Sequence, residues 1–128
     1  MPALSPFDYA IVRVVPRVER EEFINAGVIL HCHALDFLEA RAALDEARLL
    51  ALAPDADVET VRRHLDALAR IAAGGPGSGP IGELPRRERW SWLVARRSTI
   101  VQMSAPHVGL CEAPGAALRR ILDRMVRR

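Results

Sequence analysis

The short run His31-Cys32-His33 is the first group of residues whose types and spacing suit chemistry. Residues two apart on a strand share a face, so the two imidazoles are placed to bind one metal ion. His107 and Cys111 would add ligands if their segment lies beside this strand. The sequence shows no third ligand at a recognisable spacing, and Cys32 is equally typical of a small core residue. We therefore predict no metal and no cofactor, and name His31, His33, His107 and Cys111 as the ligands that a metal would use.

Nucleophilic catalysis finds little support in the sequence. A cysteine nucleophile needs a neighbouring base and surroundings that lower its pKa. Alternation along a strand points both neighbouring histidines away from Cys32, and Gly109 disfavours the helical turn that would bring His107 against the second cysteine. A nucleophile elbow, a Walker loop and a dinucleotide fingerprint are all missing. We expect a protein that binds rather than an enzyme.

A second group of residues lies on the first two predicted strands. A charged residue in the middle of an apolar strand normally needs a partner. Arg13 therefore either pairs with an acid among residues 19–22, which is the arrangement we expect, or binds the anionic group of a ligand. Asn25-Ala26-Gly27 supplies an amide and a glycine, where a β-bulge or a closely approaching backbone is expected. The candidate binding residues are Arg13, Asn25, Gly27 and His31.

The third group is a segment rich in arginine and tryptophan. Arginines with interleaved aromatic side chains stack on bases and grip phosphates. The same pattern is typical of an amphipathic helix whose tryptophans are core and whose arginines face water. Nucleic-acid binding is therefore kept as the alternative function. It would use Arg86, Arg87, Arg89, Trp92, Arg96 and Arg97.

These candidates depend on strands that the residue pattern predicts. Residues 8–16 and 23–33 are rich in β-branched residues and predict two strands. The two strands pair in antiparallel fashion, because their connection is too short for a crossover helix. Residues 37–43 and 98–103 predict further strands.

Alternation along each strand assigns its two faces. Ala10, Val12 and Val14 are expected to face the helices, while Arg13 lies on the opposite, apolar face. That face needs a cover, which a terminal helix, a second copy of the chain or a partner protein would supply. In the second strand, the even-numbered residues 22–32 are expected to share one face.

Helical signals dominate the rest of the chain. Asp45 and Asp57 are predicted to cap helices that end near residues 53 and 73, Pro85 opens a third helix, and the last helix starts near Pro114. Residues 74–80 contain only Gly, Pro and Ser and predict a flexible loop inside a single domain spanning residues 1–128. The fold class is α+β. We predict a small antiparallel sheet, made of the N-terminal strand pair and one or two further strands, packed with about four helices.

Composition narrows the class of protein further. The chain has 128 residues, of which 50% are hydrophobic and 27% charged, as in ordinary globular domains. No apolar run approaches the roughly 18 residues that a membrane helix needs, and no signal peptide is visible, so we expect a cytoplasmic protein without membrane contact. Two cysteines are too few for a disulfide framework. The net charge is −4 over residues 1–82 and +6 over residues 83–128.

Two stretches of the sequence resemble a known family. The run Tyr9-Ala-Ile-Val-Arg13-Val-Val-Pro16, followed by residues 22–30, resembles the opening of an uncharacterised bacterial family, domain of unknown function three thousand and thirty-seven. Residues 92–106 resemble its second signature, although Arg96 and Met103 stand where proline is expected. The family has no established activity, so the resemblance implies no reaction. It implies a small accessory protein whose partner is a kinase resembling the HipA toxin type.

The sequence thus predicts a small cytoplasmic binding or accessory protein. Its partner is expected to be protein, through self-association or a partner chain. A nucleic-acid-binding module that uses the Arg- and Trp-rich second half is the alternative. A small metal-binding protein or enzyme is the third and poorer reading.

Overall fold

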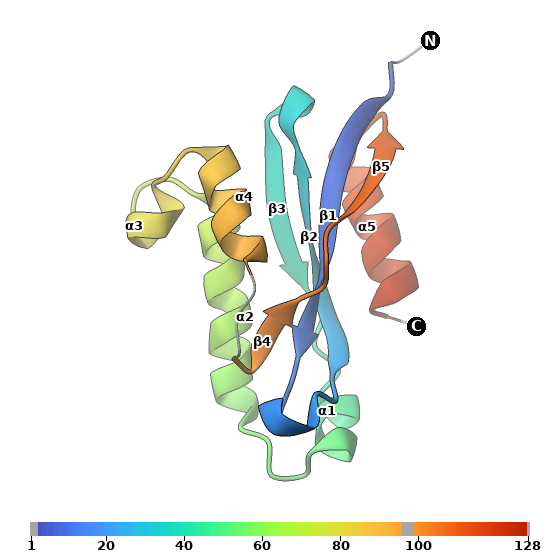
Figure 1. Ribbon diagram of the computed structural model, residues 1–128, viewed down its shortest axis with the longest axis vertical. Coiled ribbons are helices and arrows are strands. Elements are labelled where there is room, and N and C mark those ends of the chain that lie inside the picture. The colour runs from blue at the N-terminus through green and yellow to red at the C-terminus, as the bar shows by residue number, and fades with distance from the viewer. Residues whose placement is uncertain (1–2, 96–98, 128) are drawn as a thin grey trace.

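The computed structural model describes residues 3–95 and 99–127 as a three-layer arrangement around one sheet (Figure 1). Helices α2 and α4 cover one face of the sheet and α5 covers the other. The elements are β1 (Ser5–Val14), the 3-10 helix η1 (Val18–Arg20), β2 (Ile24–Cys32), the 3-10 helix η2 (His33–Leu35), β3 (Phe37–Ala42), α1 (Glu46–Leu52), α2 (Val58–Ala73), α3 (Gly79–Gly82), α4 (Arg86–Val94), β4 (Val101–Met103), β5 (His107–Cys111) and α5 (Pro114–Met125).

The sheet is antiparallel throughout, which confirms the predicted α+β class. Its strand order is β3-β2-β1, and the far edge of β1 is shared by β4 at one end and β5 at the other. The described residues thus form five strands, one more than the largest number predicted. None of the helices in these residues is long and apolar enough to cross a membrane.

Local capping explains where the helices begin. Asp45 accepts a hydrogen bond from the backbone N–H of Arg48, and Asp57 accepts one from the N–H of Thr60, both at 3.1 Å. These contacts confirm the two predicted N-caps. Pro114 is the first residue of α5, as predicted, because a helix leaves that N–H unused.

A β-bulge separates the two halves of β2. The register pairs Val12 with Gly27 but Arg13 with Asn25, so one extra residue of β2, Ala26, is accommodated there. The bulge itself was predicted. The predicted faces of β2 were wrong, because the extra residue reverses the alternation: Ala26 packs on the α2 side of the sheet, whereas Val28 packs on the α5 side.

Two hydrophobic clusters hold the layers together. The larger lies between the sheet and α1, α2 and α4, and includes Ala10, Val12 and Val14 as predicted. The smaller lies between the sheet and α5 and includes Ile11. A terminal helix therefore covers most of the second face of β1, which is one of the three covers that were expected.

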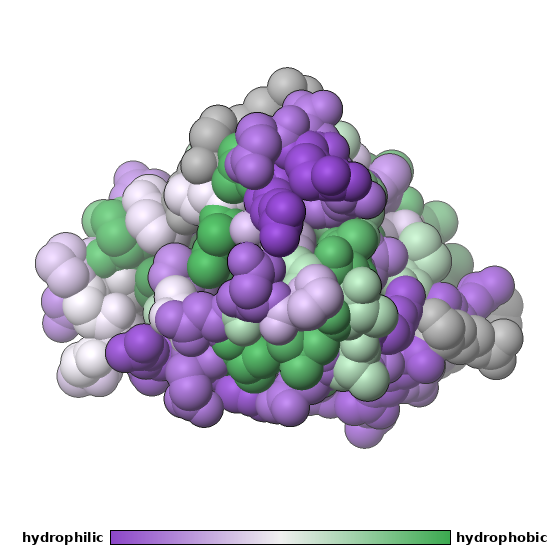
Figure 2. Space-filling view, turned by 90° about the horizontal axis from the view of Figure 1, so that it is seen from below, coloured by the Kyte–Doolittle hydropathy of each residue, from purple (hydrophilic) through white to green (hydrophobic). Residues whose placement is uncertain are grey.

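Strand β5 and helix α3 were not predicted, and neither were the two short 3-10 helices η1 and η2. Strand β5 follows Pro106, where the strand signal was expected to end, and pairs with the first half of β1. The one-turn helix α3 begins at Gly79, inside the segment predicted as a loop, and four glycines of residues 74–80 adopt positive φ. Figure 2 views the end of the molecule at the bottom of Figure 1, where hydrophobic groups are separated by hydrophilic side chains.

Candidate functional site

Arg13 projects from β1 on the α5 side of the sheet and is partly buried. Its guanidinium carbon lies 4.2 Å from the centre of the Phe23 ring. The Nε atom is buried and has no hydrogen-bond partner in the described part of the chain. The expected ion pair with an acid of residues 19–22 does not form in the described part of the chain, where Glu22 is bound by Arg20 instead.

A cavity of about 370 Å³ opens beside this arginine. Arg13 and Gln102 meet there because they are paired across β1 and β4. The segment between β1 and β2, which includes η1, supplies the rest of the wall. The lining residues are Arg13, Val15, Val18, Glu21, Phe23 and Gln102.

Asn25 and Gly27 have structural roles at the bulge beside this cavity. The Asn25 side-chain amide donates to the backbone carbonyl of Met125 at 2.9 Å, which ties β2 to the end of α5. A Cβ on Gly27 would lie 2.8 Å from the backbone oxygen of Arg41 on β3. Only glycine allows this close approach of the two strands.

His31 lies at the other end of the sheet and on the other face. Its ring stacks on Trp90 of α4 at 5.6 Å, and the residue is 5% exposed. Burial is the main reason that the pKa of His31 falls below its ordinary value; the positive charge of Arg86 lowers it further, while Asp8 opposes the shift. The four candidate binding residues therefore do not form one site.

The start of α4 carries a small basic cluster around His31. Arg87 contacts the ring nitrogen Nε2 of His33 at 3.3 Å, and Arg86 forms an ion pair with Asp36 at 3.2 Å. The Nε2 atom of His31 is buried and has no hydrogen-bond partner among the residues that the structure describes. Of the residues predicted to bind nucleic acid, Arg86 and Arg87 lie in this cluster.

The remaining members of that surface point elsewhere. Arg89 turns inward and donates to the backbone carbonyls of Leu84 at 2.7 Å and Ala72 at 3.5 Å. Trp92 lines a groove on the α2 side of α4. Arg96 and Arg97 lie outside the described residues.

The four residues named as metal ligands are divided between the faces of the sheet. The rings of His31 and His33 are 6.2 Å apart near α4. His107 packs against Tyr9 at 5.3 Å, and Cys111 belongs to the cluster under α5. Within residues 3–95 and 99–127, no three His, Cys, Asp or Glu side chains are grouped closely enough to hold a metal ion.

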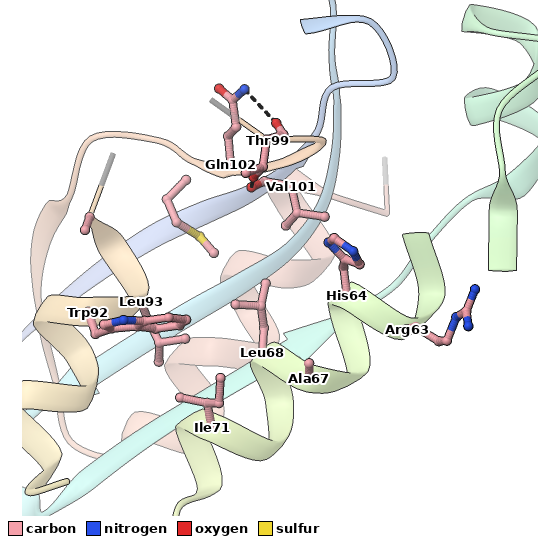
Figure 3. A pocket seen from close by; sticks show the side chains of 12 residues that line it. Arg63, His64, Ala67, Leu68, Ile71, Trp92, Leu93, Thr99, Val101 and Gln102 are labelled. Carbon is pink, nitrogen blue, oxygen red and sulfur yellow. Dashed lines mark hydrogen bonds between the residues drawn. The ribbon is translucent and has the colours of Figure 1, made fainter. Parts of the chain in front are cut away.

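An apolar groove of about 350 Å³ separates α2, α4 and β4 (Figure 3). The close-up shows Leu68 and Ile71 of α2, Trp92 and Leu93 of α4, and Val101 of β4 around it. Apolar residues at these positions are typical of a core helix or strand. The sequence alone therefore does not predict a groove between the three segments.

The last candidate surface is the edge strand β5, which pairs only with β1 among the described residues. Val108 is 79% exposed and Leu110 is 60% exposed. In the register they lie opposite Asp8 and Pro6, and Leu4, which is 58% exposed, precedes that stretch of β1. An apolar strip therefore remains uncovered at this end of the sheet. The alternation Val-Gly-Leu after a proline was its only sequence signal.

The fold and these surfaces define a small α+β protein with a free sheet edge and an unpaired arginine at a cavity. The chain belongs to the family described as protein of unknown function (DUF3037), whose model matches residues 9–126. That match confirms the resemblance drawn from the sequence. Neither a curated protein nor a solved structure matches the chain.

Proposed function

We propose that this protein acts by binding protein, and that it binds through the outer edge of β5, with a second copy of the chain as the partner that fits. The observation that carries the proposal is the combination of an unpaired strand edge with exposed apolar side chains on the same strand. Soluble proteins usually protect such an edge with charge, proline or a covering element. Residues 107–111 contain no acidic, lysine or arginine residue.

The hydrogen-bond pattern of β1 identifies the backbone groups on the free edge. The N–H of Ile11 donates to Ser104 Oγ at 2.8 Å, and its C=O accepts from the Ser104 N–H at 2.9 Å. Odd-numbered residues of β1 thus turn their backbone groups toward β4 and β5. Across the register, their partners in β5 are also odd-numbered. The N–H and C=O groups of Val108 and Leu110 therefore point outward.

A second copy of β5 matches this edge in both backbone and side chains. Antiparallel pairing about Gly109 places Val108 of each copy opposite Leu110 of the other. The outward backbone groups then bond to each other, and the apolar side chains of both copies lie on one face of a continuous sheet. This contact is self-complementary, as a two-fold interface requires.

Sedimentation velocity over protein concentrations from about 1 µM to about 1 mM tests the proposal, because this range spans the dissociation constants of weak and moderate complexes. We expect a monomer–dimer equilibrium that Val108→Lys abolishes. Leu50→Lys is the matched control, since Leu50 is an exposed leucine on α1, at the opposite end of the molecule in Figure 1. A chain that stays monomeric throughout, or a dimer that survives Val108→Lys, overturns the proposal.

A second variant separates strand pairing from simple apolar contact. Val108→Pro removes an N–H that faces solvent, a substitution that edge strands tolerate. The monomer should keep its melting temperature within a few degrees, while dimerisation is lost with the hydrogen bond. Dimerisation at the wild-type affinity in this variant would show that β5 does not pair across the interface.

Two further partners are proposals of lower rank. The kinase of HipA type that the family resemblance implies would bind as a separate chain, which co-purification with and without Val108→Lys tests. Nucleic-acid binding is favoured only by the Arg86, Arg87 and His33 cluster. It predicts an affinity that falls steeply with salt, because phosphate contacts release counterions.

A further inference from the structure

Within residues 3–95 and 99–127, the guanidinium of Arg13 has no hydrogen-bond acceptor. It makes no hydrogen bond and no ion pair with a described residue, and only the face of the Phe23 ring compensates its charge. Burying a charged group normally requires a hydrogen-bonded partner. The planar fork of an arginine matches a carboxylate or phosphate, which binds through two parallel hydrogen bonds.

An acidic group lines the same cavity without neutralising Arg13. Glu21 ends η1 in the left-handed region, at a φ of 57°, and its N–H donates to the carbonyl of Val18 at 3.2 Å. Its carboxylate forms no ion pair or hydrogen bond with a described residue. The cavity thus offers one positive and one negative side chain that are not paired with each other. A ligand with a second negative charge, such as a phosphate dianion, would be repelled by the Glu21 carboxylate.

The rest of the wall combines one polar group with apolar surface. The Gln102 amide nitrogen donates to the carbonyl of Thr99 at 2.8 Å, which leaves its side-chain oxygen as an acceptor. Val15, Val18 and the half-exposed Phe23 supply the apolar part. The volume of about 370 Å³ lies at the lower end of the range for small-molecule sites.

We propose that this cavity binds a small zwitterion with an apolar body, the chemistry of a free apolar α-amino acid. Arg13 holds the carboxylate, Glu21 and the Gln102 oxygen accept from the ammonium group, and Phe23 packs on the apolar side group. This site is independent of the interface at β5, because it lies at the opposite end of β1, beside β4.

Titrations followed by NMR chemical shifts test the site with three probes. L-leucine carries both charges, L-leucinamide lacks the carboxylate, and N-acetyl-L-leucine lacks the ammonium group. We expect saturable shifts with L-leucine and at least tenfold weaker binding of each of the other two. The absence of saturable shifts with L-leucine up to about 10 mM, which corresponds to binding too weak for a specific site, would overturn the proposal.

Variants assign the two charges separately. Arg13→Gln should weaken L-leucine binding at least tenfold, whereas Arg41→Gln, a partly buried arginine on β3, should leave it unchanged. Glu21→Gln should abolish the preference for L-leucine over N-acetyl-L-leucine, whereas Glu19→Gln, outside the cavity lining, should keep it. Unchanged binding by Arg13→Gln would overturn the assignment.

Controls keep these outcomes separate from folding and from dimerisation. Arg13→Lys retains the charge without the fork, so it should fold like the wild type and still bind L-leucine more weakly. A wild-type protein that forms the dimer but does not bind L-leucine would overturn this site alone. L-leucine binding by monomeric Val108→Lys would confirm that the two surfaces are separate.

Discussion

Replacing Arg13 by methionine tests how this arginine is held in the folded protein. Its contact with the Phe23 ring, at 4.2 Å, is a cation–π interaction worth about 0.5–2 kcal/mol, depending on how far it is desolvated. Its buried Nε has no hydrogen-bond partner among residues 3–95 and 99–127, which costs roughly 1–3 kcal/mol that the variant regains. Methionine has a similar length and keeps the apolar contacts of the side-chain stem.

Because these two effects oppose each other, we expect Arg13→Met to change the free energy of unfolding by less than about 1.5 kcal/mol. A buried ion pair broken on one side would instead cost about 3–5 kcal/mol. Urea denaturation followed by tryptophan fluorescence measures the difference, since Trp90 is buried in the core. A loss of about 3 kcal/mol in Arg13→Met would show that Arg13 is paired. If Glu21 is the partner, the double variant with Glu21→Gln would lose less than the sum of the two single variants.

Three further outcomes follow from the structure. Gly27→Ala should lower the free energy of unfolding by about 1–3 kcal/mol, because the new Cβ would lie 2.8 Å from the backbone of β3. Gly115→Ala is the control and should not destabilise the protein, because no atom lies within 4 Å of its new Cβ. Urea midpoints measure both effects. Burial lowers the pKa of His31 from its ordinary 6.5, so the unfolded state binds more protons below that pH. Stability should then fall as the pH is lowered through this range, and His31→Phe should reduce the slope. Burial and the neighbouring Cys32 raise the pKa of the Cys111 thiol. We therefore expect Cys111 to react with a disulfide reagent at pH 8 only when the protein unfolds. Rapid labelling of the native protein would contradict this.

Local signals were sufficient for the elements whose cause is local. Asp45 and Asp57 cap helices because their own side chains reach the following N–H groups, which a sequence shows directly. Strand β5 has no such signal, since Gly109 weakens it and its place is fixed by β1. The ring of Phe7 lies where a Cβ on Gly109 would be, at 2.5 Å, so the glycine serves a contact about 100 residues away in the chain.

The sequence predicted one residue of the arginine cavity but not the others that surround it. A lone arginine among apolar strand residues drew attention to Arg13, which lines a cavity in the structure. Its surroundings come from pairing with Gln102 on β4 and from the conformation of Glu21, and neither is encoded near residue 13. The expected local ion pair does not form among the described residues, although Glu21 lines the same cavity as Arg13.

The bulge at Ala26 explains why one predicted binding group became two separate surfaces. Without it, Asn25, Gly27 and His31 would lie on one face of β2, and the grouping predicted from strict alternation would hold. The extra residue leaves Asn25 on the α5 side with Arg13, where it bonds to the end of α5, and turns His31 toward Trp90 on α4. One inserted residue thus separates the arginine cavity from the histidine cluster. To assign the faces of such a strand from sequence, one must know on which side of the glycine the register changes. That position depends on pairing with β1, and Gly27 is held close to the β3 backbone on the other side.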